Sequence, residues 1–193
     1  MNTLFPIYVK LDQINTLLIG GGPVGLEKLQ ALLSNSPNAK VKIIARDVID
    51  EIVALVNSNE LLSLEIREFQ ECDLDGMDLL IMATNNPEFN EEVKQLAKSR
   101  HLLVNVADKP DLCDFYLGSV VQKGNLKIGI STNGKSPTIA KRLKEFLNEL
   151  LPEEIDETLN LMASYRNSLK GDFQRKVTVL NAHTESLLKG AGS

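Results

Sequence analysis

A glycine-rich turn between an apolar run and a helical pattern constrains this chain more than any other feature. The sequence GGGPVG occupies residues 20–25. The apolar run at residues 16–19 before it predicts a short buried strand. Leucines recur after it at helical spacing, at Leu26, Leu29, Leu32 and Leu33. A strand, a turn with three glycines and a helix form the start of a β-α-β unit.

In that context the spacing G-x-G-x-x-G predicts a turn that binds a dinucleotide. We expect Gly20 to allow the sharp turn, Gly22 to let the backbone approach a pyrophosphate, and Gly25 to let the helix lie close on the strand. The pyrophosphate would then meet the free N–H groups at the start of the helix. A tight turn that binds no ligand is the alternative, because glycine also serves wherever φ must be positive.

The first half of the chain alternates strand and helix patterns. Further strands are expected at residues 40–45, 64–67, 78–83 and 102–106. Five strands separated by crossovers predict an α/β fold with a doubly wound, Rossmann-like parallel sheet.

After about residue 115 the pattern changes. A small α+β segment is expected there, with hairpin strands at residues 116–122 and 126–131 and a helix that Ser136 and Pro137 open. Such a hairpin has exposed edges, so it should pair with the main sheet or with a second copy of the chain. We predict a nucleotide-binding domain over 1–115, a dimerisation segment over 116–150 and a C-terminal helical segment over 151–193.

Composition excludes several classes of protein. The 193 residues are 43% hydrophobic and 24% charged, as in ordinary globular proteins, and no apolar run reaches the roughly 20 residues that span a bilayer. The first residues do not fit a secretory signal, and Cys72 and Cys113 fit neither a disulfide framework nor a zinc site. We therefore expect a cytoplasmic protein with free thiols, no membrane partner and no resident metal.

The charge is unevenly distributed. The net charge of −5 argues against a nucleic-acid partner. Residues 1–115 carry 10 Lys+Arg against 18 Asp+Glu, a net −8, whereas residues 116–193 carry 11 against 8, a net +3. The basic part either contacts an anionic ligand or reflects unspecific surface charge.

Polar side chains follow several predicted strands, where open α/β sheets bind their ligands. Arg46 and Asp47 follow the second strand, where an adenosine ribose would lie, and they favour NAD over NADP; the alternative is that they only cap the next helix. Thr84 follows the fourth strand and is a candidate cofactor contact. Asn105 and Asp108 belong to the fifth strand and the turn after it, where Asp108 is either a general base or only a turn residue.

These motifs together resemble one family. The turn at residues 20–24 with Lys28, and the stretches at residues 83–86, 105–110 and 131–137, occur in the order and spacing of precorrin-2 dehydrogenases, the siroheme-synthase module. The opening residues 4–9 are also similar to the start of that module.

The resemblance implies NAD-dependent oxidation of precorrin-2 to sirohydrochlorin, which some members follow by inserting Fe²⁺, and it implies a homodimer. It places the family's essential aspartate on Asp108 and its NAD contacts on Pro23, Val24, Arg46 and Asp47.

Precorrin-2 carries eight carboxylates, for which the basic segment offers cations. Lys135 and Arg142, with Ser136 as the cap of the helix, are the candidate substrate contacts beside Asn105. The alternative for the charged helix residues is a solvated helix face. Two other functions stay open: a regulatory module that senses NAD, and a different small NAD(P)-dependent oxidoreductase.

Overall fold

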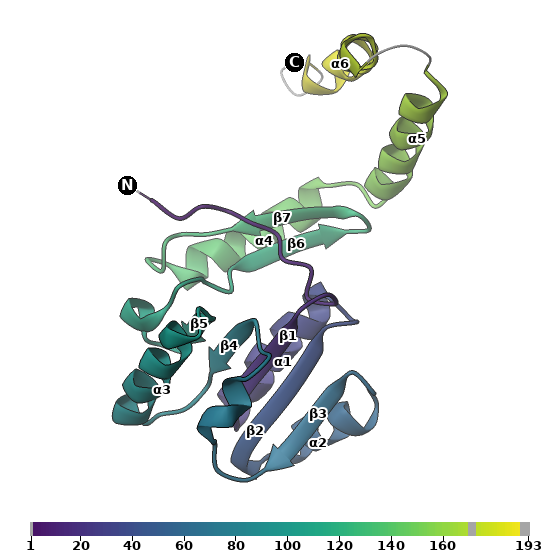
Figure 1. Ribbon diagram of the computed structural model, residues 1–193. Helices are drawn as coiled ribbons and strands as arrows, with labels where there is room; N and C mark the ends of the chain where they lie inside the picture. The colour runs from purple at the N-terminus through teal and green to yellow at the C-terminus, as the bar shows by residue number, and fades with distance from the viewer. Residues whose placement is uncertain (1, 170–172, 190–193) are drawn as a thin grey trace. The chain divides into compact units, whose positions relative to one another are not determined.

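Five parallel strands form the main sheet, in the order β3-β2-β1-β4-β5 (Figure 1). The computed structural model describes residues 2–169 and 173–189. The part of the chain that contains this sheet consists of β1 (Asn15–Gly21), α1 (Pro23–Asn35), β2 (Lys40–Val48), α2 (Asp50–Asn57), β3 (Leu62–Ile66), η1 (Glu71–Leu74), β4 (Leu79–Met82), α3 (Pro87–Ser99), β5 (Leu103–Val106) and η2 (Pro110–Leu112). The predicted Rossmann-like sheet is confirmed.

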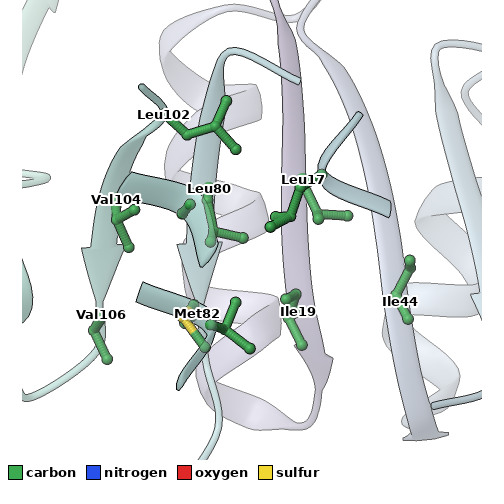
Figure 2. Close-up of a cluster of buried hydrophobic side chains, with 11 residues drawn as sticks. Leu17, Ile19, Ile44, Leu80, Met82, Leu102, Val104 and Val106 are labelled. Atoms are coloured by element: carbon green, nitrogen blue, oxygen red, sulfur yellow. The ribbon is translucent and has the colours of Figure 1, made fainter. Parts of the chain in front are cut away.

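Both faces of this sheet are buried, because helices pack on each of them. Successive side chains of a strand point to opposite faces and so enter the two cores in turn. Figure 2 shows one face, where apolar side chains of the strands gather, among them Leu17, Ile19, Leu80 and Met82. Residues of α3 and η1 pack on this face, and residues of α1 and α2 pack on the other, around Leu18. Strands β1 and β4 appear in the sequence as short uncharged runs because side chains on both of their faces are buried.

The chain divides into two compact units at Gly118 and Ser119. The second contains β6 (Ser119–Lys123), β7 (Leu126–Ile130), α4 (Pro137–Leu150), α5 (Ile155–Ser168) and α6 (Phe173–Lys189). Strands β6 and β7 form the predicted antiparallel hairpin. The finer division of the chain at residues 115 and 150 stays a prediction.

The start of the hairpin differs from the expected one. Strand β6 begins at Ser119 rather than at residue 116. Earlier in the same connection, the Asp114 N–H donates to the Val104 carbonyl oxygen of β5 over 2.7 Å. The helical pattern after residue 153 corresponds to two helices, α5 and α6, and Leu169 is extended at the end of α5.

No helix among the described residues is long and apolar enough to cross a membrane.

Candidate functional site

The glycine turn connects β1 to α1 and cannot be built from larger residues at Gly20, Gly21 and Gly25. At Gly21 a Cβ would overlap the carbonyl oxygen of Asp47. Gly20 has φ +120°, and a Cβ there would overlap the backbone of Ala83. A Cβ at Gly25 would overlap the carbonyl oxygen of Gly20, so the predicted close packing of helix on strand is confirmed. The turn is therefore fixed by backbone contacts within the fold.

Gly22 differs from the other three glycines of the turn. It is the N-cap of α1 with φ −88°, and a Cβ built there meets no heavy atom within 4 Å. The space beside it is open, next to Pro23 and Val24 in the first turn of the helix. An open space beside helix N–H groups is what an approaching pyrophosphate requires, so this turn fits a dinucleotide.

A cleft of about 340 Å³ lies at the carboxyl ends of the strands, beside this turn. Residues from β1 and β2, from the segment after β3, and from the loop after β4 and the start of α3 surround it. They are Ile19, Gly20, Gly21, Ile44, Ala45, Arg46, Asp47, Arg67, Glu68, Phe69, Thr84, Asn86 and Phe89. Its volume is within the range of small-molecule sites.

Four predicted cofactor residues meet in this cleft: Gly20, Arg46, Asp47 and Thr84. Arg46 and Asp47 lie within β2 rather than after it, because that strand continues to Val48. They do not cap the following helix, whose N-cap is Ile49 without a side-chain bond, so this alternative is wrong.

Thr84 is held in place from helix α3. Its hydroxyl donates to Asn90 Oδ1, and Asn90 Nδ2 donates back to the Thr84 carbonyl oxygen over 3.2 Å. Asn90 is almost fully buried, so this pair fixes the loop between β4 and α3 at the rim of the cleft.

Asp108 lies in the turn directly after β5. It is exposed and has φ +58°, the left-handed conformation that aspartate tolerates better than most residues. The Cys113 sulfur packs against the same turn, within 3.2 Å of the Val106 nitrogen and oxygen and 3.3 Å of the Lys109 oxygen. Burial raises the pKa of the Cys113 thiol, which keeps it protonated and able to donate.

Asn105 is buried behind this turn rather than open to a ligand. Its Nδ2 donates to the Phe115 carbonyl oxygen over 2.8 Å and lies 3.6 Å from the Cys113 sulfur. The geometry gives Asn105 a structural part in joining β5 to the following loop.

The other candidate substrate residues belong to the second unit. Ser136 caps α4, as predicted: its hydroxyl oxygen accepts from the Ile139 N–H over 3.2 Å. Lys135 is exposed in the preceding turn. Arg142 is exposed on α4, pairs with Glu145 over 2.9 Å, and lines a shallow depression with Pro137, Thr138 and Lys141.

The cleft residues that were not predicted include Arg67, Glu68, Phe69 and Phe89. The first three follow β3, and the rule that parallel strands present their carboxyl ends at one edge could have found them. Phe69 and Phe89 meet edge to face, with ring centroids 5.8 Å apart.

Arg67 is clamped by two carboxylates. Its Nη1 and Nη2 donate to Asp73 over 2.8 and 2.6 Å, and its Nε donates to Glu65 over 2.8 Å. Lys42 also contacts both acids, at 2.9 Å from Glu65 and 3.1 Å from Asp73. The Arg67 guanidinium, opposed by the cost of burial, holds the pKa of the Asp73 carboxyl well below its usual range.

Comparisons with known proteins agree with this geometry. A family model described as putative NAD(P)-binding matches residues 7–119, and one described as sirohaem biosynthesis protein central matches residues 123–150. The siroheme synthase of Vesicomyosocius okutanii is 34% identical over 175 residues, which are 91% of this chain and 37% of that protein. The siroheme synthase of Pseudoalteromonas translucida is 34% identical over 169 residues, or 88% of this chain and 35% of that protein.

A solved structure shares the fold. SirC, precorrin-2 dehydrogenase, superposes with a TM-score of 0.71 at 23% identity and covers 93% of this chain and 88% of its own. The chain spans about a third of the length of the curated relatives it matches. The two family models follow one another along the chain, and together with these relatives they confirm the predicted resemblance. The protein therefore belongs to the siroheme synthase family and matches the module in which an NAD(P)-binding part is followed by the central part.

Proposed function

We propose that this chain oxidises precorrin-2 to sirohydrochlorin with NAD. The observation that supports it most is one sheet edge that carries both a dinucleotide-type glycine turn with its cleft and, after β5, the exposed Asp108. The names of its relatives point the same way: siroheme synthases, and a precorrin-2 dehydrogenase with the same fold.

In this proposal the dinucleotide lies along the turn and the cleft. Gly20 and Gly22 admit the pyrophosphate with Pro23 and Val24 beside it, Arg46 and Asp47 contact the adenosine ribose, and Thr84 contacts the cofactor further along. Bound NAD supplies the acceptor for a hydride. Oxidation of precorrin-2 also releases a proton, and the Asp108 carboxylate is the proposed base that takes it.

The polyanionic substrate needs cations. We assign its carboxylates to Lys135, to Arg142 and to the helix start that Ser136 caps. Asn105 stays a candidate substrate contact, although its amide is engaged within the fold.

The experiment that tests the function is direct. Purified protein is mixed with NAD⁺ and precorrin-2, and NADH and sirohydrochlorin are followed by absorbance, with and without Fe²⁺. Formation of both products supports the dehydrogenase, and a further spectral change with Fe²⁺ adds metal insertion. NAD⁺ binding without turnover would favour the regulatory module, and turnover of other substrates alone would favour a different oxidoreductase.

Gly22 offers a clean test of the cofactor site. We expect Gly22→Val to weaken NAD⁺ binding by about 100-fold or more, because its side chain would fill the space assigned to the pyrophosphate. The fold should tolerate it, since φ −88° suits any residue. Calorimetry measures the affinity and circular dichroism the fold. Unchanged affinity would show that the site lies elsewhere.

We also propose a homodimer formed through the second unit. Helix α4 buries Ala140 but exposes one apolar stripe, with Ile139 54%, Leu143 43%, Phe146 58% and Leu150 62% accessible. A stripe at this spacing is suited to packing against a second copy of the chain.

The dimer is expected to dissociate in Phe146→Glu, which would place a charge within the stripe. Light scattering at micromolar concentration should report a dimer for the wild type and for the control Lys144→Glu, an exposed position of the same helix, and a monomer for Phe146→Glu. A wild-type monomer would contradict the proposal. We further propose a cytoplasmic location, which the two free thiols at Cys72 and Cys113 favour.

A further inference from the structure

The end of the cleft formed by β2 and the segment after β3 contains two arginines, which differ in what they can still bind. A guanidinium has five N–H donors. In Arg67 all of them point to partners: Nε to Glu65, Nη1 to Asp73 and to the Glu68 carbonyl oxygen, and Nη2 to Asp73 and Glu65, at 2.6 to 2.8 Å. Arg67 therefore lines the cleft without a free donor for a ligand.

Arg46 is the arginine that a ligand could reach. Its side chain is 75% exposed, and its Nη1 lies 3.7 Å from the Glu68 carboxylate, which is 80% exposed. A contact at this distance between exposed groups is weak and can be exchanged for a ligand. Arg46 is thus available, but a carboxylate accompanies it.

The charges at this end of the cleft do not favour a further anion. Two cations, Lys42 and Arg67, face two carboxylates, Glu65 and Asp73. We call this cluster the clamp, and its charges cancel. Arg46 and Glu68 cancel in the same way. Asp47 remains, which leaves one net negative charge among the groups at this end.

This is the end where the adenosine ribose of a dinucleotide lies in a Rossmann-like fold, beside the last residues of the second strand. NAD presents two ribose hydroxyls there, which can donate to carboxylates. NADP presents a 2′-phosphate, which would meet Asp47 and Glu68 and gain nothing from Arg67.

We infer that Glu68 is a specificity-determining residue: with Asp47 it excludes a 2′-phosphate, while the Asp73 and Glu65 clamp withdraws Arg67 from phosphate binding. The cleft therefore selects NAD over NADP. This inference rests on the proposed binding of NAD in the cleft.

The test compares the dissociation constants of NAD⁺ and NADP⁺, measured by calorimetry on the full chain. The wild type should bind NAD⁺ at least about 10-fold more tightly. Glu68→Gln should tighten NADP⁺ binding by about 10-fold and change NAD⁺ binding much less. The negative charge that repels the 2′-phosphate is then gone, whereas the glutamine oxygen can still accept from a ribose hydroxyl. Glu60→Gln, an equal charge change at an exposed position outside the cleft lining, should leave the ratio unchanged.

A second substitution separates this inference from a general charge effect. In the double variant Glu68→Gln with Arg46→Ala, the gain for NADP⁺ should be smaller than in Glu68→Gln, because the repulsion by Glu68 is removed but the cation that would pair with the 2′-phosphate is removed too. Equal wild-type affinities, no gain in Glu68→Gln, a gain for both dinucleotides alike, or a gain in the double variant as large as in Glu68→Gln would each overturn the inference. A wild type that binds neither dinucleotide would instead remove the proposed cofactor site itself, and the inference with it.

Discussion

Asp108→Asn is expected to lower the turnover of precorrin-2 by about 100-fold or more while NAD⁺ binds as in the wild type. Asparagine keeps the size of the side chain and tolerates the left-handed φ of +58°, so the turn should be preserved. It cannot accept the proton that the oxidation releases. Steady-state kinetics measure the turnover, and calorimetry measures NAD⁺ binding.

The matched control is Asp111→Asn, which removes the same charge from an exposed position in the same loop. It should leave turnover within about 2-fold of the wild type, because Asp111 is exposed and has no part in the proposed cofactor or substrate contacts. If Asp108→Asn turns over almost normally, Asp108 is only a turn residue and another base acts. If it also loses NAD⁺ binding, the carboxylate contributes to the cofactor site instead.

The sheet could be predicted because its evidence is local. Parallel strands buried on both faces read as short apolar runs, and Leu17, Leu18 and Leu80 lie in such runs. The glycine turn indicated where the connection from β1 through α1 to β2 begins. The end of β2 was placed too early, because the exposed Arg46 and Asp47 resemble a loop although they continue the strand.

The site was predicted in part. Residues in motifs, such as Gly20, Asp47 and Thr84, do line the cleft. Arg67 and Glu68 were missed although they follow a strand end, because no motif marks them. The partners of Arg67 become known only from the fold, in which η1 brings Asp73 against it. Asn105 remains a predicted substrate contact, and its amide bonds to the Phe115 carbonyl oxygen, which the local sequence does not indicate.

The ion-pair cluster of Arg67 and Lys42 with Asp73 and Glu65 is where a substitution is expected to cost the most stability. Asp73→Asn should lower the free energy of unfolding by about 3 kcal/mol, the range for removing one partner of a buried ion pair. The Asp73 side chain is 2% exposed and accepts from Arg67, from Lys42 and from the Gln70 N–H over 2.8 Å. Asparagine would leave both cations without an equal countercharge. Urea unfolding of both proteins at neutral pH measures the difference.

The same carboxylate should make stability depend on pH in a definite direction. Hydrogen bonds from Arg67, from the Gln70 N–H and from Lys42, against the cost of burial, keep the pKa of Asp73 low in the folded protein, whereas the unfolded chain has the ordinary value of about 4. The stabilisation from Asp73 is therefore fully present above that value and is lost as the pH falls below it, because the unfolded state then binds a proton that the folded state does not. The loss of stability between about pH 5 and pH 3 should be smaller in Asp73→Asn than in the wild type.

The control for both predictions is Asp75→Asn. The Asp75 carboxylate is 67% exposed beside Arg100, so this substitution should cost less than about 1 kcal/mol and keep the pH dependence of the wild type. Equal costs for the two substitutions would show that burial does not strengthen the clamp, and Arg67 would then be free to move toward the cleft.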